Sequence, residues 1–262
     1  MITPAPPNKP LTSYAFDILV WGGLALALLA SFGPAEVWKV PDLIGGAGNI
    51  ADLAAGFAKP DFTRAGRYVA DMGLTLAIAI WGTALAVMIG APLSLLCANN
   101  VAPFWVVRPF RLVADVLRSI NEFVFAMLFV VAVGLGPIAG LLAVTASTTG
   151  IVAKLFSEAV EATDPRPVEG VRAVGASRLQ EIFYGVLPQV APLWTSLALY
   201  RFESNVRAAT VLGIVGAGGI GQTLYENIRG FRYAESAAVV LIIIAAVWLT
   251  DGLSSFIRKR MI

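Results

Sequence analysis

The most informative absences in this sequence are those of histidine, cysteine and charge. The chain of 262 residues contains no histidine and a single cysteine, Cys97. An intramolecular disulfide is therefore excluded, and the commonest metal ligand and general base is missing. Charged residues make up 14% of the chain, hydrophobic residues make up 58%, and the mean hydropathy is +0.77. Because several runs approach the roughly 20 apolar residues that a membrane helix needs, this composition excludes a soluble globular domain and predicts a polytopic membrane protein.

The missing residue types also limit the enzyme classes. Neither H-E-x-x-H nor G-x-S-x-G occurs in the chain, so the signatures of a zinc protease and of a serine hydrolase are absent. An intramembrane enzyme would need a carboxylate-based mechanism, and no suitable pair of carboxylates is evident. We therefore expect no catalytic residue and no metal site.

Apolar runs separated by polar or glycine-rich stretches predict an all-α protein with about six transmembrane helices. The runs cover residues 14–34, 69–98, 120–133, 138–156, 193–214 and 236–256. The first run follows a short tail, residues 1–13, and is interpreted as an anchor because no small-residue cleavage site follows it. Residues 35–68 then form an external loop, and residues 69–262 form the main transmembrane domain.

Basic residues predict the orientation. Arg258, Lys259 and Arg260 follow the last apolar run directly. Since short cytoplasmic segments are enriched in Lys and Arg, this cluster predicts a cytoplasmic C-terminus. The same orientation places the N-terminus and residues 164–192 in the cytoplasm, and it leaves the smaller share of the basic residues outside.

Residues 164–192 are a polar stretch that is predicted to form two short helices joined at a glycine. Asp164 can cap the first helix, a proline follows in its opening turn, and Gly175 stands where a left-handed residue ends a helix. Ser177 and Gln180 form an S-x-x-Q capping box for the second helix. The pattern therefore predicts a helix–glycine–helix loop.

The second helix of this loop is amphipathic. Its apolar residues recur at i, i+3, i+4, i+7 and i+8 and so share one face. They are Leu179, Ile182, Phe183, Val186 and Leu187. Pro188 either closes the helix or kinks it into the next apolar run. The apolar face can meet a partner protein or the chain's own membrane helices, and the sequence leaves both open.

A glycine-rich passage lies between the fifth and sixth apolar runs. Gly216, Gly218, Gly219 and Gly221 fit the pattern G-x-G-x-x-G. A nucleotide site is rejected because Gln222 stands where a P-loop has lysine, no strand precedes the passage, and the orientation places it outside. An external glycine-rich turn, or a point where helices pack closely, is expected instead.

The fifth apolar run carries Arg201, Glu203, Asn205 and Arg207. A charge within a bilayer costs about 2.5–3.5 kcal/mol, so these side chains should face a cavity or a partner. Glu203 and Arg207 are four residues apart and are predicted to pair on one helix face. Arg201 lacks a carboxylate at that spacing, so it needs another partner such as Glu122, or an anionic substrate. Ion pairs between helices or subunits are the structural alternative.

Asn121 and Glu122 lie at the inner end of the third run, where interfacial hydrogen bonding is expected. Together with the polar residues of the fifth run they form the candidate substrate pathway. Hydroxyl groups also cluster in the fourth run, from Thr145 to Thr149. These can be satisfied by backbone carbonyls of their own helix, which favours a structural role.

The polar loop resembles the cytoplasmic loop of ABC importer permeases. That family's pattern is E-A-A, three residues, G, nine residues, I, one residue and L-P. Glu169, Gly175, Leu187 and Pro188 keep the glutamate, the glycine and the L-P at these intervals. The departures from the commonest residues are Gly170, Val171 and Gly185.

The resemblance covers about residues 69–260. It includes Thr75-Leu76, the G-L-G-P of residues 134–137 and the G-A-G-G-I-G of residues 216–221. Within the importers, residues 120–137 and 199–221 look like those of phosphonate importer permeases. The resemblance implies a binding-protein-dependent type I importer permease fold, with a methionine-importer-like core and an additional N-terminal helix.

The resemblance also implies partners. They are a second copy of the chain, two ABC ATPase subunits that hold ATP and Mg, and an external phosphonate-binding protein, assembled in the cytoplasmic (inner) membrane of a prokaryote. This chain would bind no cofactor and no nucleic acid, and would pass a phosphonate or related phosphorus oxyanion by alternating access. The residues implied in coupling to the ATPase are Glu169, Gly175, Ser177, Leu179, Ile182, Phe183, Val186, Leu187 and Pro188. A permease for another small solute of the same class is the alternative, and a channel or an ion-driven carrier is a further one.

Overall fold

The computed structural model describes residues 11–41, 45 and 47–261, and these contain helices and turns but no strand. The predicted all-α class is confirmed. The chain divides into two compact units, Met1–Gly56 and Phe57–Ile262. The predicted cytoplasmic tail, residues 1–13, lies mostly outside the described residues.

The first unit contains α1 (Leu11–Phe32), the 3-10 turn η1 (Val37–Lys39) and most of α3 (Ala47–Phe57). α1 has 22 residues and is therefore about 33 Å long at 1.5 Å per residue. Large apolar side chains such as Leu19 and Trp21 are exposed along it, as expected for a helix that faces lipid. The predicted loop of residues 35–68 is thus partly helical.

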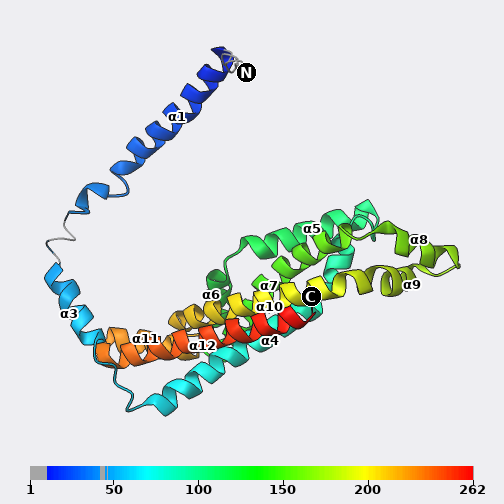
Figure 1. Cartoon of the computed structure of the whole chain (residues 1–262). Helices are drawn as coiled ribbons and strands as arrows, with labels where there is room; N and C mark the ends of the chain where they lie inside the picture. The colour runs from blue at the N-terminus through cyan, green and yellow to red at the C-terminus, as the bar shows by residue number, and fades with distance from the viewer. Residues whose placement is uncertain (1–10, 42–44, 46, 262) are drawn as a thin grey trace, which may run out of the picture. The chain divides into compact units, whose positions relative to one another are not determined.

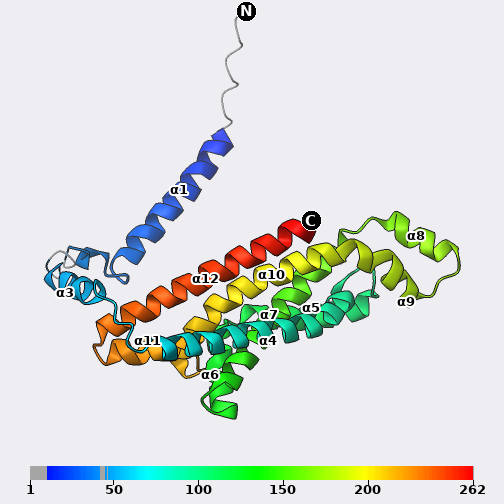
Figure 2. The ribbon, with the colours of Figure 1, turned by 60° about the horizontal axis from the view of Figure 1, so that its bottom comes forward.

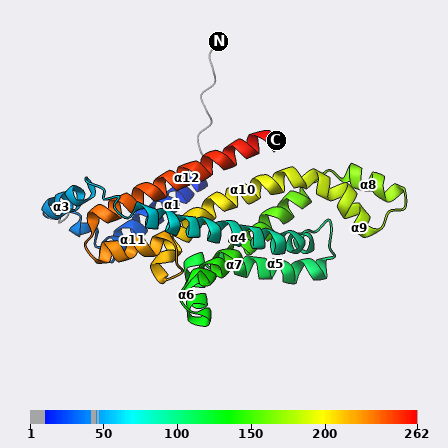
Figure 3. The same ribbon diagram turned by 90° about the horizontal axis from the view of Figure 1, so that it is seen from below.

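Four long helices form the body of the second unit. They are α4 (Ala65–Cys97), α7 (Pro137–Glu161), α10 (Leu187–Leu212) and α12 (Tyr233–Met261). They run side by side along this unit in Figure 1, Figure 2 and Figure 3. α11 (Ile220–Arg229) lies at one end of the unit, and α8 (Pro165–Ala173) and α9 (Arg178–Gln180) lie at the other (Figure 1).

α7 is the central helix of this unit. Of its most apolar 18 residues 61% are buried, against 39% or less in the other three long helices. Glycines let its neighbours approach closely. A Cβ added to Gly82 of α4 would lie 2.7 Å from Val144 Cγ1, and one added to Gly90 would lie 2.8 Å from Val152 Cγ1.

The structure corrects the third predicted span. α6 (Glu122–Val133) has 12 residues, which is about 18 Å and too short to cross a 30 Å hydrocarbon core. It follows α5 (Phe104–Ser119), and the two helices are bent by 89° relative to each other. The sequence reading missed α5 because its apolar residues occupy only one face, between arginines. Among the described residues, four helices can cross a membrane, and α5 with α6 adds a fifth if the bent pair is one span.

Candidate functional site

The polar loop begins as predicted. Oδ1 of Asp164 accepts a hydrogen bond from Arg166 N–H at 3.0 Å and so caps α8. Gly175 follows α8 with φ of +82°, the left-handed conformation that glycine adopts without strain. The side chain of Gln189, in α10, holds this start in place: its Oε1 accepts from Asp164 N–H at 3.0 Å, and its Nε2 donates to the Asp164 carbonyl at 3.2 Å. Gln189 was missed because a single glutamine belongs to no local pattern.

The second helix also begins as predicted. Oε1 of Gln180 accepts from Ser177 N–H at 2.7 Å within a capping box. After α9 the chain forms a π-helical turn, η2 (Glu181–Val186), and passes directly into α10. Of the two alternatives predicted for Pro188, closing the helix is excluded, because the helix is continuous over residues 178–215. The loop therefore passes into the fifth predicted span without a break.

Gly170 and Gly185, two of the residues that depart from the family's loop pattern, have different surroundings. A Cβ added to Gly185 would lie 3.0 Å from Val168 Cα, so glycine lets α8 pack closely on η2. A Cβ added to Gly170 would meet nothing within 4 Å. Of these two glycines, only Gly185 lies in a tightly packed contact.

The apolar face of the second helix is divided between two environments. Val186 is 3% exposed and packs, with Leu187, in a hydrophobic cluster formed by the chain itself. Ile182 is half-buried. Leu179 and Phe183 are instead 68% and 62% exposed. The chain's own helices thus cover one half of the face, and the other half is open.

Further exposed apolar side chains extend the open half. Val174 and Tyr184 are 85% and 71% exposed, and with Leu179 and Phe183 they form what we call the exposed loop face. α8 and α9 project beyond the end of the long helices (Figures 1 and 2). A pocket of about 430 Å³ on this loop is lined by Val171, Val174, Gly175, Ala176, Gln180 and Tyr184.

Glu181 is a loop residue that the sequence analysis missed. Its side chain is only 8% exposed. It accepts hydrogen bonds from Nε and Nη2 of Arg172 at 2.9 and 3.0 Å, and from Nη1 of Arg178 at 2.9 Å. The helix that contains it has 38 residues, about twice what a span needs, so its first turns extend beyond a bilayer core. The hydrogen bonds from Arg172 are the main cause that lowers the pKa of Glu181 from 4.5 to about 2. Burial of the carboxylate acts in the opposite direction, and the hydrogen bond from Arg178 lowers the pKa further. The carboxylate is therefore ionised at neutral pH.

The ion pairs of α10 differ from those predicted. Glu203 pairs with Arg258 at 2.9 Å, and Arg207 pairs with Asp251 at 3.4 Å. The predicted pair between Glu203 and Arg207 is wrong because α12 lies beside α10 and supplies a partner for each. The charged residues of the last predicted span and of the C-terminal cluster therefore join two helices.

Asn205 connects three helices. It is 2% exposed; its Nδ2 donates to Thr83 Oγ1 of α4 at 2.8 Å, and its Oδ1 accepts from Thr148 Oγ1 of α7 at 3.0 Å. Thr145 and Thr149 donate to backbone carbonyls of their own helix at 2.8 and 2.7 Å, as predicted. These contacts place Asn205 among the helix-packing residues.

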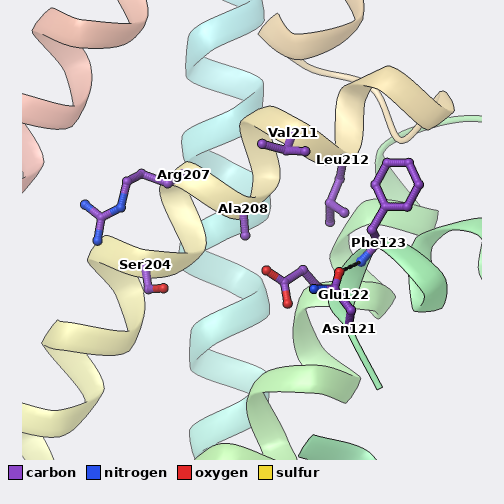
Figure 4. Close-up of a pocket in the computed structure, with 8 residues that line it drawn as sticks. All are labelled: Asn121, Glu122, Phe123, Ser204, Arg207, Ala208, Val211 and Leu212. Atoms are coloured by element: carbon purple, nitrogen blue, oxygen red, sulfur yellow. Dashed lines mark hydrogen bonds between the residues drawn. The ribbon is translucent and has the colours of Figure 1, made fainter. Parts of the chain in front are cut away.

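A pocket of about 320 Å³ lies between α6 and α10 (Figure 4). It is lined by Asn121, Glu122, Phe123, Ser204, Arg207, Ala208, Val211 and Leu212. The Glu122 carboxylate is directed toward Ser204 and Ala208, whereas the Arg207 guanidinium points away from it (Figure 4). Oδ1 of Asn121 accepts from Phe123 N–H at 2.8 Å and so caps α6. The pocket therefore presents one carboxylate and no directly opposed guanidinium.

Arg201 lies one turn before Ser204 in α10. Its buried Nε has no hydrogen-bond partner among the described residues. Glu122 attracts it electrostatically, but the described residues include no ion pair between the two. Arg201 is thus a cation of α10 with an unsatisfied buried nitrogen.

The glycine-rich passage is a close-packed turn, as predicted. Gly216, Gly218 and Gly219 have φ of +83°, +78° and +78°. A Cβ added to Gly221 would lie 1.7 Å from the Thr210 carbonyl oxygen. Backbone therefore meets backbone here, which only glycine permits.

Three sequence motifs meet at this turn. Ile220 N–H donates to Thr75 Oγ1 at 2.9 Å, and Gly136 N–H donates to the Gly216 carbonyl at 2.9 Å. The T-L, G-L-G-P and G-A-G-G-I-G motifs thus form one structure, which we call the glycine end. Within the described residues, no group of three or more acidic or cysteine side chains could hold a metal ion.

Comparison with solved structures shows the fold. Inward-facing MetNI methionine ABC transporter matches with a TM-score of 0.66 at 21% identity, over 74% of this chain and 95% of that one. A bacterial ABC transporter involved in the import of alginate matches with a TM-score of 0.65 at 16% identity, over 94% of this chain and 99% of that one. The fold, including the predicted methionine-importer-like core, is that of ABC importer permeases.

Comparison with known sequences shows the family. A phosphite transport system permease protein of Stutzerimonas stutzeri is 42% identical over 83% of this chain and 80% of its own length. A phosphate-import permease protein of Mycolicibacterium smegmatis is 41% identical over 72% of this chain, which spans only 36% of that protein. The model of binding-protein-dependent transport system inner membrane components matches residues 90–262. The chain therefore belongs to this family of multi-pass inner membrane transport components.

Proposed function

We propose that this chain is the membrane-spanning subunit of an ATP-driven importer for a phosphonate or a related phosphorus oxyanion. The observation that carries the proposal is the projecting helix–glycine–helix loop, which presents apolar side chains beyond the long helices. The names of the phosphite and phosphate-import relatives support the substrate class. ATP and Mg belong, in this proposal, to a separate ATPase subunit.

The exposed loop face is the proposed ATPase contact. Exposed apolar area that projects from the membrane is unfavourable in water by roughly 25 cal/mol per Å² and is typical of a protein interface. Leu179 and Phe183 would dock, and Gly175 and Ser177 would set the loop's shape. Ile182, Val186, Leu187 and Pro188 would join the loop to α10, and Glu169, exposed on α8, would complete the contact.

The proposed assembly contains two copies of this chain, two ATPase subunits and an external binding protein. The few predicted crossings of one chain hardly enclose a pathway, which favours a second copy. ATP is cytoplasmic, so both termini and the loop are assigned to the cytoplasm, and the glycine end is assigned to the outer face. Substrate would pass between these ends by alternating access.

Arg201 is the proposed substrate contact within the membrane. Its Nε lacks a hydrogen-bond partner, and a guanidinium suits the oxygens of a tetrahedral anion. Glu203 and Arg207 already have partners in α12. We therefore assign the pathway role to Arg201.

The docking role is tested with two matched glycine substitutions in the loop. Gly175→Ala adds a Cβ in open space but at φ +82°, where a left-handed conformation costs about 1–2 kcal/mol. Gly170→Ala also adds a Cβ in open space, but within helix α8. We expect co-purification of the ATPase subunit to fall several-fold with Gly175→Ala and to stay unchanged with Gly170→Ala.

Two outcomes would contradict the proposal. Absence of any co-purifying ATPase from the wild-type protein would favour a channel or an ion-driven carrier. Equal retention of the ATPase by both variants would remove the docking role from this loop.

A further inference from the structure

An ion-pair cluster joins the loop to a second, sequence-distant part of the chain. We define the Glu181 cluster as Glu181, Arg172 and Arg178. Arg172 lies on α8 and Glu181 on η2, while Arg178 donates from Nη2 to the carbonyls of Asn100 and Val101 at 3.0 and 2.9 Å. Those carbonyls belong to the turn between α4 and α5. The cluster therefore spans both loop helices and this turn.

The α4–α5 turn is in turn bonded to the end of α7. Nδ2 of Asn100 donates to the Val160 carbonyl at 2.7 Å. Both the backbone N–H and Nδ2 of Asn99 donate to Glu161 Oε1 at 2.8 Å, and Arg111 of α5 pairs with the same carboxylate. A continuous series of polar contacts thus runs from α8 through the α4–α5 turn to the end of α7 and to Arg111 in the middle of α5.

Arg178 is the connecting residue because it uses two different nitrogens. Its Nη1 bonds Glu181, and its Nη2 bonds the two carbonyls of the turn. Only a guanidinium offers this fork, since a lysine ammonium is a single point charge. Glu181 is nearly buried whereas Arg172 and Arg178 are 56% and 53% exposed. The carboxylate thus fixes arginines that remain in contact with water.

The loop is covalently joined to two membrane helices. Residues 162–164 connect it to α7, and the continuous helix over residues 178–215 connects it to α10. The α4–α5 turn has no such covalent connection to the loop. The Glu181 cluster supplies a polar connection to this turn through Arg178.

We propose that the Glu181 cluster transmits movement of the loop to the α4–α5 turn, with Arg178 as the positioning residue. This inference rests on the proposed docking of an ATPase to the loop. Loss of the Arg178 fork should leave the exposed loop face, and hence ATPase binding, intact. The variant complex should still hydrolyse ATP but should transport less substrate for each ATP hydrolysed.

The test is transport per ATP hydrolysed, measured in proteoliposomes with the ATPase and binding protein and with phosphite and methylphosphonate as probes. Arg178→Lys keeps the charge and removes the fork. We expect its transport per ATP to fall about five-fold, within the range of substitutions in coupling networks. Arg166→Lys is the matched control: this loop arginine is 86% exposed and, within the described residues, pairs only with Asp164 two positions earlier, so its transport per ATP should be unchanged.

Glu181→Gln is the second variant and should lower the ratio in the same direction while ATPase retention persists. An unchanged ratio in both variants would overturn the inference. A fall in transport that only parallels loss of the ATPase subunit would also overturn it, since the cluster would then serve docking. If the wild-type complex retains no ATPase, the proposed function fails first, and the inference fails with it.

Discussion

The two ends of the second unit are held together by different means. At the glycine end, Gly213, Gly219 and Gly221 allow backbone to meet backbone or a buried threonine, with no room for a side chain. At the loop end, the contacts include the ion pairs of the nearly buried Glu181 with two half-exposed arginines, beside apolar residues that the described part of the chain leaves exposed. Close steric packing holds the backbone at the glycine end, whereas the ion pairs at the loop end can break and re-form. A fixed end opposite an adjustable one would suit the proposed docking of an ATPase subunit to the loop.

The largest expected effect is at the glycine end. Gly221→Ala would place a Cβ 1.7 Å from the Thr210 carbonyl oxygen. Because both atoms belong to packed helices, we expect a loss of about 3 kcal/mol or more in the free energy of unfolding, seen as loss of monodisperse protein on size exclusion in detergent. Gly252→Ala in α12, where an added Cβ meets nothing within 4 Å, should behave as wild type. Equal yields of the two variants would show that this end is not sterically fixed.

An intermediate effect is expected between the ends, at Arg201. Removing a charge-assisted hydrogen bond to an anion costs about 1.5–3 kcal/mol, so Arg201→Ala should lower the rate of phosphite transport by about ten-fold or more. Assembly and basal ATPase activity should persist. Arg207→Ala, which breaks the half-exposed pair with Asp251, should have a smaller effect. If Arg201→Ala instead prevents assembly, Arg201 holds the structure together and does not contact substrate.

The smallest effect on the protein is expected from single-cysteine substitutions, whose labelling compares the accessibility of the two ends directly. Cys97 is 1% exposed, so Cys97→Ala gives a silent background. Glu226→Cys at the glycine end should react with an impermeant thiol reagent in intact cells, and Arg166→Cys in the loop should react only after permeabilisation. Both positions are exposed, so folding should not change. The reverse labelling pattern would invert the proposed orientation.

The loop conformation was predictable because its determinants are local. The Asp164 cap, the left-handed Gly175 and the Ser177–Gln180 capping box each depend on residues a few positions apart. The same i, i+4 reasoning failed for Glu203 and Arg207, since α12 supplies partners that are distant in the sequence. α5 escaped notice because an amphipathic helix gives no continuous apolar run.

The sequence by itself determined the all-helical membrane class, the local form of the loop and the glycine turn, because hydropathy, capping and glycine φ act over short distances. Only the tertiary structure decided which half of the loop's apolar face is covered, and which charges pair. Periodicity shows that Val186 and Phe183 share a face, but not that a neighbouring helix reaches only one of them. Ion pairs act over a few ångströms between residues that packing brings together, as with Arg178 and the α4–α5 turn.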